Sequence, residues 1–117
     1  MTDFKRAQRV AVEVHKALSE IVLRGLKDPR ITPFSITEVR VTDDLRLARV
    51  RIVPLGGEGN TEKLLAGLRS AAGYLSRQIA KQLRIKYSPR LEFFLDDSLP
   101  DAISVLRGLK SIRDDEE

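Results

Sequence analysis

Apolar side chains recur at helical spacing in the first quarter of the chain. The apolar positions of this pattern are Val10, Val14, Ala17, Leu18 and Ile21. Their spacing of three or four residues predicts an amphipathic helix from about Phe4 to Arg24. The helix should end close to Gly25, because the Asp28-Pro29 step that follows disfavours helical geometry in the residue before the proline.

Two runs of alternating apolar and polar residues follow this helix. Ser35 to Thr42 and Leu47 to Val53 have the two-residue period of strands. The inward positions expected in the second run are Ala48, Val50 and Ile52. The residues between the runs, Asp43 to Arg46, favour turns, so we expect the two strands to pair as an antiparallel hairpin.

The second half of the chain returns to helical spacing and then to alternation. Apolar positions from Leu64 to Ala72 and from Leu75 to Leu83 predict two helical segments, with Gly73 between them. Because a glycine inside a helix costs about 1 kcal/mol relative to alanine, we expect a break or kink there rather than one straight helix. Leu91 to Asp96 predicts a third strand, and Leu99 to Ile112 predicts a short terminal helix.

The order of these elements, α-β-β-α-α-β with a C-terminal helix, predicts the fold class α+β. We expect one domain over residues 1–117, with a three-stranded sheet covered by the helices and a short acidic C-terminal tail. A length of 117 residues with 42% hydrophobic residues suits a single core. The alternative, a ferredoxin-like arrangement, would need a fourth strand, and neither the segment 54–64 nor the residues after Asp97 supply one.

Composition narrows the possible chemistry. The chain has no cysteine and one histidine, so disulfides, thiolate metal sites and a cysteine nucleophile are excluded, and we expect no metal and no cofactor. Charged residues interrupt every long apolar segment, and no apolar run with a cleavage site follows Met1, so neither a membrane span nor a signal peptide is predicted. We therefore expect a cytoplasmic protein.

Positive charge is concentrated in one segment. The formal net charge is +4, yet residues 63–90 contain seven lysines and arginines and no acid, so the rest of the chain is net negative. Within this segment, Arg77, Lys81 and Arg84 fall on the side of the helix opposite its apolar positions. Such residues are most often simply solvated, but like charges without acids repel one another unless a polyanion neutralises them. We favour contact with RNA phosphates.

Small residues precede this basic face. Ala71, Ala72 and Gly73 would let a sugar-phosphate backbone approach closely, as in the Gly-x-x-Gly loop of KH domains, although two tightly packed helices would explain them equally well. A literal match at Gly56 to Gly59 follows a strand and contains an acid, so we interpret it as a loop. The predicted RNA-binding residues are Ala71, Ala72, Gly73, Arg77, Lys81, Arg84, Lys86, Arg69, Lys5, Arg6 and Arg9. The last three lie in the first turns of the first helix, where they either contact a partner or are ordinary solvated cations.

Little in the sequence supports catalysis. His15 has no serine or cysteine motif with which to form a triad, and we expect it to be a packing residue. The pairs Asp43-Asp44 and Asp96-Asp97 could bind magnesium, but each fits a turn at the end of a strand. We predict a binding module with no catalytic residue; a magnesium-dependent nuclease and a protein-interaction domain that binds no RNA are the alternatives.

Several motifs, in their order along the chain, resemble those of bacterial ribosome-binding factor A. They are Arg6 to Leu26, Asp28-Pro29-Arg30, Val41-Thr42-Asp43-Asp44-Leu45 with Ala48, Ala71-Ala72-Gly73-Tyr74-Leu75, Arg84, Pro89-Arg90-Leu91-Glu92-Phe93, Asp96-Asp97-Ser98 and the closing helix. The resemblance spans nearly the whole chain. It implies a type II KH-like domain in which an Ala-x-Gly segment replaces Gly-x-x-Gly, with Ala71 and Gly73 at those positions.

The resemblance also implies a function. Members of that family bind the immature small (30S) ribosomal subunit, assist maturation of the 5′ end region of 16S rRNA, and matter most in the cold. The expected partners are therefore the small subunit and its ribosomal RNA, with no membrane, and we expect a monomer when the protein is free. A general KH-like RNA-binding protein is the alternative.

Overall fold

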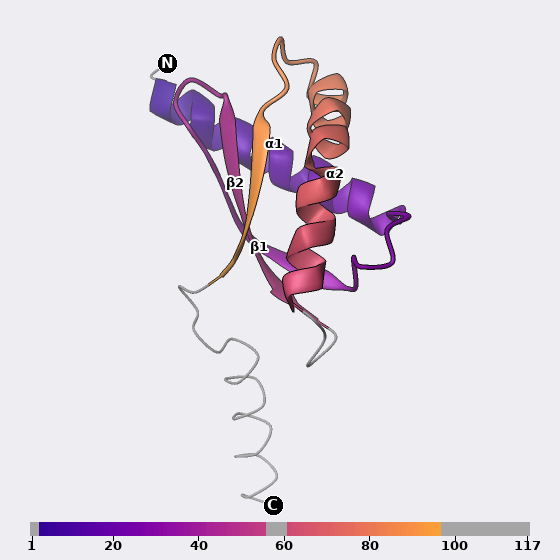
Figure 1. Ribbon diagram of the computed structural model, residues 1–117. Coiled ribbons are helices and arrows are strands. Elements are labelled where there is room, and N and C mark those ends of the chain that lie inside the picture. Colours follow the sequence, from indigo (N-terminus) through magenta and orange to yellow (C-terminus); the bar gives the residue numbers. More distant parts are fainter. Residues whose placement is uncertain (1–2, 56–60, 97–117) are drawn as a thin grey trace, which may run out of the picture.

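The computed structural model of the protein describes residues 3–55 and 61–96. In chain order its elements are α1 (Asp3–Leu23), β1 (Phe34–Val41), β2 (Leu47–Pro54), α2 (Thr61–Leu83) and β3 (Arg90–Leu95). The helices form one layer and the sheet the other, with α1 packed against β1 and α2 against β3 (Figure 1). One core contains buried side chains from all of these elements. This arrangement confirms the predicted α+β class.

The sheet has the strand order β1-β2-β3, with β2 in the centre. β1 and β2 form the predicted antiparallel hairpin, in which Val41 pairs with Ala48 next to the turn. β3 runs parallel to β2. The side chains of Ala48, Val50 and Ile52 are 0% exposed, which confirms the inward face predicted for the central strand.

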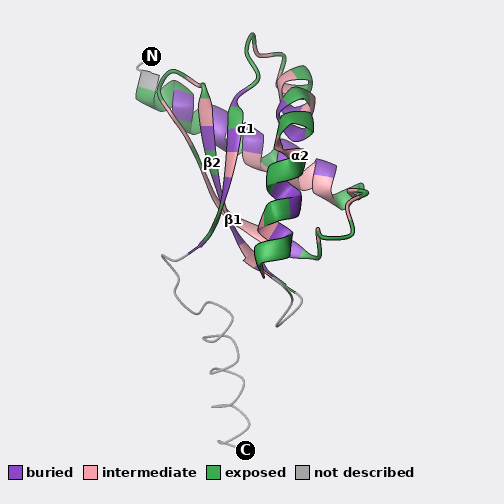
Figure 2. Ribbon diagram, in the orientation of Figure 1, coloured by how far each residue is buried: buried purple, intermediate pink, exposed green. Residues whose placement is uncertain are grey.

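The first helix buries the apolar face that its spacing predicts. Val14 and Leu18 are 0% exposed, and Figure 2 shows the buried positions of both helices turned toward the sheet. The helix ends at Leu23. Gly25 follows with a φ of 94°, a left-handed conformation that glycine adopts without strain, so the predicted end of the helix is also confirmed.

The Asp28-Pro29-Arg30 triplet forms a compact turn between α1 and β1. The Asp28 carboxylate accepts hydrogen bonds from the Arg30 guanidinium (2.6 Å) and the Arg30 backbone N–H (2.9 Å), and these bonds lower the pKa of Asp28. The turn lies against α2 at Gly67, where a Cβ atom would be 2.8 Å from Cγ1 of Ile31. Gly67 therefore permits a close approach between the turn and the helix that no local pattern indicated.

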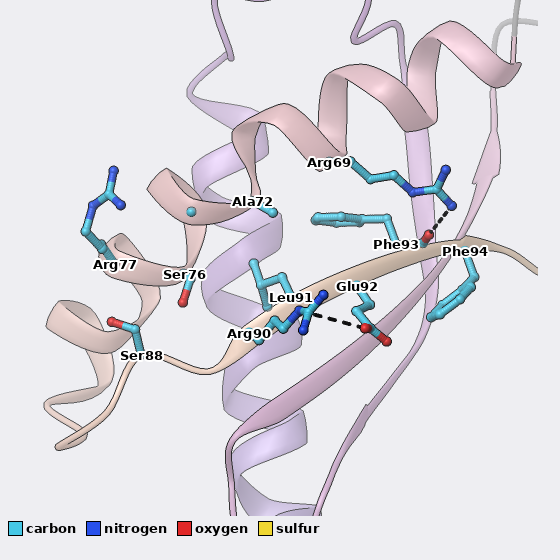
Figure 3. Close-up of a pocket in the computed structure, with 11 residues that line it drawn as sticks. Arg69, Ala72, Ser76, Arg77, Ser88, Arg90, Leu91, Glu92, Phe93 and Phe94 are labelled. Carbon is cyan, nitrogen blue, oxygen red and sulfur yellow. Dashed lines mark hydrogen bonds and ion pairs between the residues drawn. The ribbon is translucent and has the colours of Figure 1, made fainter.

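The predicted division of the second helical region into two helices is wrong. α2 is a single helix from Thr61 to Leu83 that continues through Gly73. Figure 3 shows its axis changing direction near Ala72, so the chain bends there without leaving the helix. Leu68 and Leu75, on either side of the bend, are 0% exposed. Burying two such side chains outweighs the cost of about 1 kcal/mol for a helical glycine.

The described sheet has three strands, so residues 3–55 and 61–96 do not supply the fourth strand of the ferredoxin-like alternative. None of the described helices is long and apolar enough to cross a membrane. The helix predicted at 99–112, the acidic tail and the glycine-rich loop at 56–59 lie outside the described residues.

Candidate nucleic-acid interface

The basic face of α2 carries cations without acidic partners. Arg77, Lys81 and Arg84 are exposed, and none of their side chains forms an ion pair or hydrogen bond with the described part of the chain. On the opposite side of the helix, Leu75 and Ile79 are 0% exposed. The separation of core and cationic faces is therefore as predicted.

The arginines of the sheet, unlike the cations of the α2 face, form ion pairs with glutamates. They pair with carboxylates, Arg40 and Arg51 with Glu38 at 3.1 and 3.4 Å, and Arg49 and Arg90 with Glu92 at 3.9 Å each. The described part of the chain thus supplies acids to these arginines of its sheet but none to Arg77, Lys81 and Arg84. That difference is expected if phosphate groups of a partner neutralise the α2 face.

A groove of about 740 Å³ runs between α2 and β3 (Figure 3). Ala72, Gly73 and Arg77 line its helical wall, and Arg90 and Phe94 are among the residues of its strand wall. Gly73 leaves the helical wall open, because a Cβ atom there would meet only Nη1 of Arg77, at 3.4 Å. Two of the three small residues that were expected to admit a nucleic-acid backbone, Ala72 and Gly73, therefore line this groove.

Two side chains of α2 hold β3 at the floor of this groove. Ser76 donates a hydrogen bond to the carbonyl of Pro89, and Nη2 of Arg69 donates one of 3.0 Å to the carbonyl of Phe93. Arg69 was predicted to bind RNA, and part of its guanidinium is instead engaged with the protein. Ala71, another predicted residue, packs against the core and does not line the groove.

β3 is an edge strand, and its free edge faces the groove. The backbone N–H groups of Arg90 and Asp96 donate to carbonyls of Arg46 and Ile52 on the β2 side, at 2.7 and 2.9 Å. Because successive backbone groups of a strand point to opposite sides, the N–H of Leu91 is directed away from β2. The groove therefore places Arg77 of α2 beside an edge of β3 that pairs with no other described strand.

The end of α2 is formed by Arg84 in a left-handed conformation, with a φ of 55°. The N–H of Ile85 donates to the carbonyl of Ala80 (3.2 Å), and the N–H of Arg84 donates to that of Lys81 (3.3 Å). This is a Schellman motif, in which glycine usually occupies the position of Arg84. A left-handed arginine costs roughly 1–2 kcal/mol. The Arg84 side chain is exposed, and no ion pair with another described residue offsets this cost.

Of the three α1 cations predicted to bind RNA, only Arg6 lines a hollow at this end of α2. Arg6, Arg84 and Lys86 line a second hollow of about 480 Å³, together with residues of the β1–β2 turn. Lys5 and Arg9 are exposed but line neither of the two hollows. Arg77 of the groove and Arg84 of the second hollow are seven residues apart, which corresponds to about 10 Å at the helical rise of 1.5 Å per residue.

The sequence pattern did not identify the strand wall of the groove. Ser88 and Arg90 line it without having been predicted, because a strand pattern does not show which edge stays unpaired. The one usable signal is the order of elements. A strand that follows a crossover helix often pairs in parallel at the outside of the sheet and leaves its other edge beside that helix.

Asp44 and His15, which were considered for catalysis, lie where they support the fold. The carboxylate of Asp44 accepts hydrogen bonds from Oγ1 of Thr42 (2.6 Å) and from the N–H of Arg46 (3.0 Å), and these bonds lower its pKa. Asp44 therefore supports the β1–β2 turn. His15 is partly buried on α1. Within the described ranges, no three histidine, cysteine, aspartate or glutamate side chains gather as metal ligands.

Comparison with known families agrees with this geometry. The family model of ribosome-binding factor A matches residues 6–108 of the 117-residue chain. The chain belongs to the ribosome-binding factor A family. The matched range contains every predicted site residue except Lys5.

Individual relatives of the ribosome-binding factor A family match most of the chain. It is 44% identical over 100 residues to ribosome-binding factor A of Clostridioides difficile (strain 630). The aligned region covers 85% of this chain and 78% of the relative. It is 39% identical over 109 residues to the factor of Geobacter sulfurreducens, covering 93% of this chain and 92% of the relative.

Solved structures of ribosome-binding factor A share the fold. The crystal structure of the factor from Thermus thermophilus gives a TM-score of 0.66 at 26% identity, covering 76% of this chain and 94% of that one. A homology model of the Thermus thermophilus factor, fitted into a cryo-EM map of a complex with the 30S subunit, gives a TM-score of 0.64 at 26% identity. This match covers 78% of this chain and 96% of that one. The fold is therefore the KH-like fold that the sequence resemblance implied.

Proposed function

We propose that the protein binds the immature small ribosomal subunit through phosphates of its ribosomal RNA and assists maturation of the 5′ end region of 16S rRNA. The observation that carries the proposal is the unpaired cationic face of α2 beside the groove that Gly73 leaves open. Membership of the ribosome-binding factor A family and the 30S complex of the Thermus thermophilus factor support the partner. On this proposal the protein acts in the cytoplasm, is a monomer when free, and is needed most in the cold.

The α2 face contributes affinity rather than sequence preference. Each of Arg77, Lys81 and Arg84 can neutralise one phosphate and release its condensed counterion, so binding should weaken as salt increases. An arginine can also donate two parallel hydrogen bonds to one phosphate. Because phosphates are the same at every nucleotide, these contacts position the protein, and the shape of the RNA together with the groove selects the site.

Two matched double variants test the proposal. Arg77→Gln/Lys81→Gln removes two unpaired cations, whereas Arg40→Gln/Arg49→Gln removes two arginines that are paired with glutamates. Both variants have the same net charge, and both should fold, because exposed charges contribute less than about 0.5 kcal/mol to stability. We expect only the first variant to lose co-sedimentation with small subunits at moderate salt.

Two other outcomes of this comparison contradict the proposal. Equal losses in both variants would show that net charge, rather than the α2 face, governs binding. Wild-type sedimentation of both variants would place the contact elsewhere on the protein. Circular dichroism of each variant serves as the control for folding.

Maturation and catalysis require separate measurements. Cells depleted of the protein should accumulate 16S rRNA with an unprocessed 5′ end, more so at low temperature, and Arg77→Gln/Lys81→Gln should not restore processing. Correct 5′ ends in depleted cells would refute the maturation role. Magnesium-dependent cleavage of RNA by the purified protein, abolished by Asp44→Asn or Asp96→Asn, would instead show a nuclease.

A further inference from the structure

Tyr87 lies among cations at one end of the molecule. It belongs to the loop between α2 and β3, and its side chain is 59% exposed. Nζ of Lys86 is 5.5 Å from the centroid of its ring, and Cζ of Arg46 is 5.9 Å from it. Neither cation forms an ion pair with another described residue. An exposed aromatic ring with cations over it has the composition of surfaces that stack unpaired bases.

Three segments that are distant in the sequence meet around this ring. The second hollow is lined by Arg6 of α1, by Leu45 of the β1–β2 turn, and by Arg84, Lys86 and Tyr87 after α2. Figure 1 places the start of α1, this turn and the α2–β3 loop at the same end of the molecule. Arg6 and Arg84 also lack acidic partners within the described ranges. The fold therefore gathers four cations without ion pairs, those two together with Arg46 and Lys86, around one ring.

Backbone strain marks the same hollow independently. The described non-glycine residues with a positive φ are Leu45, at 62°, and Arg84, at 55°, and both line it. Each such conformation is strained for a residue with a side chain, and glycine at either position would avoid that strain. Strained residues of this kind concentrate at binding sites, where the strained conformation contributes to ligand binding rather than to folding stability.

Acidic residues set the orientation of a ligand in this hollow. Asp43 and Asp44 line the side formed by the β1–β2 turn, and the carboxylate of Asp44 accepts hydrogen bonds from the Thr42 hydroxyl and the Arg46 backbone N–H. Their negative charge repels phosphate. A nucleic-acid backbone should therefore pass on the side of Arg84 and Lys86, with the base directed toward the ring.

We infer that this hollow binds one unpaired nucleotide of RNA, with its base stacked on Tyr87 and its flanking phosphates held by Arg84, Lys86 and Arg6. The inference rests on the proposed function and adds a second contact to it. The α2 groove would hold the RNA backbone, and the ring, in the loop after the end of α2, would hold a base. Stacking requires an accessible base face, so the site selects single-stranded RNA over duplex.

The fluorescence of Tyr87 reports directly on stacking. The chain has two tyrosines and no tryptophan, so Tyr74→Phe leaves Tyr87 as the sole tyrosine. We expect short single-stranded oligoadenylate to quench the emission of the full-length Tyr74→Phe protein, and a blunt RNA duplex of equal length to leave it unchanged. No quenching by the single strand, or equal quenching by both, would overturn the inference.

A pair of substitutions at Tyr87 tests the site on the small subunit. Tyr87→Phe keeps the aromatic face and should bind within about twofold of wild type, whereas Tyr87→Leu keeps apolar bulk without that face and should bind roughly tenfold more weakly. Wild-type affinity of Tyr87→Leu would overturn the inference while leaving the α2 contact intact. Failure of the wild-type protein to bind small subunits at all would instead refute the proposed function.

Discussion

Replacing Gly73 by alanine should stabilise the protein while weakening its binding to RNA. Gly73 is exposed in the interior of α2, and a Cβ atom there would meet only Nη1 of Arg77, at 3.4 Å. That is ordinary contact with the end of a flexible side chain. The change should therefore gain the difference in helix propensity, about 0.8–1 kcal/mol. In a domain of this size, such a gain raises the midpoint of thermal unfolding by roughly 4–8 °C.

The same methyl group should lower affinity, because it projects beside Arg77 on the wall of the groove. It would narrow the space for a sugar-phosphate backbone and displace the guanidinium from its position. A hydrogen bond to a charged group contributes about 1.5–3 kcal/mol. Weakening one such bond should reduce affinity for small subunits by roughly tenfold.

Thermal denaturation by circular dichroism and titration with purified small subunits measure the two effects separately. Ser70→Ala is the matched control, since Ser70 is an exposed position of α2 that does not line the groove. It should gain helix propensity and keep wild-type affinity. Unchanged affinity in Gly73→Ala would refute the role of the groove. A loss of stability would show that the glycine is needed by the fold instead.

Three further substitutions test other parts of the structure. Arg84→Gly should raise the free energy of unfolding by about 1 kcal/mol in urea titrations, because the left-handed φ of 55° no longer strains a side chain. It should also weaken subunit binding as much as Arg84→Gln, which gains no stability; equal stabilities of the two variants would contradict the strain. Leu68→Ala should lower the free energy of unfolding by about 2–5 kcal/mol in the same assay, since the side chain is 0% exposed, and a smaller loss would mean that the core closes around the cavity. The bonds to Asp44 hold its pKa below the ordinary 3.8, so they stabilise the fold above that pH and are lost as the pH falls through the lower folded value. The difference in melting temperature between wild type and Asp44→Asn should therefore shrink in acid, and a constant difference would exclude this linkage.

The strands and the core face of each helix were predictable because they depend on local periodicity. Each strand begins and ends within one residue of its expected position, as β2 does at Leu47–Pro54. The continuity of α2 was not predictable in the same way. The local cost of Gly73 is visible in the sequence, whereas the burial of Leu68 and Leu75 against the sheet, which opposes it, depends on long-range packing.

The candidate site was likewise predictable only in part. Its cations follow from a segment, residues 63–90, that contains no acid. The groove could not be predicted from the sequence, because it depends on β3 leaving one edge free beside α2. Neither the hydrogen bond from Arg69 to Phe93 nor the left-handed conformation of Arg84 has a local signature. Such features arise from contacts between segments that only the folded chain brings together.

The salt dependence of small-subunit binding tests most directly whether the unpaired cations of α2 contact phosphates. The dissociation constants of wild type, Arg77→Gln/Lys81→Gln and Arg40→Gln/Arg49→Gln would be measured over a series of potassium chloride concentrations. The slope of log affinity against log salt should be smaller by roughly 1.5 in the α2 variant, because two phosphate contacts are lost, and unchanged in the sheet variant. The same slope for the α2 variant and the wild type would contradict the assignment of this face to RNA.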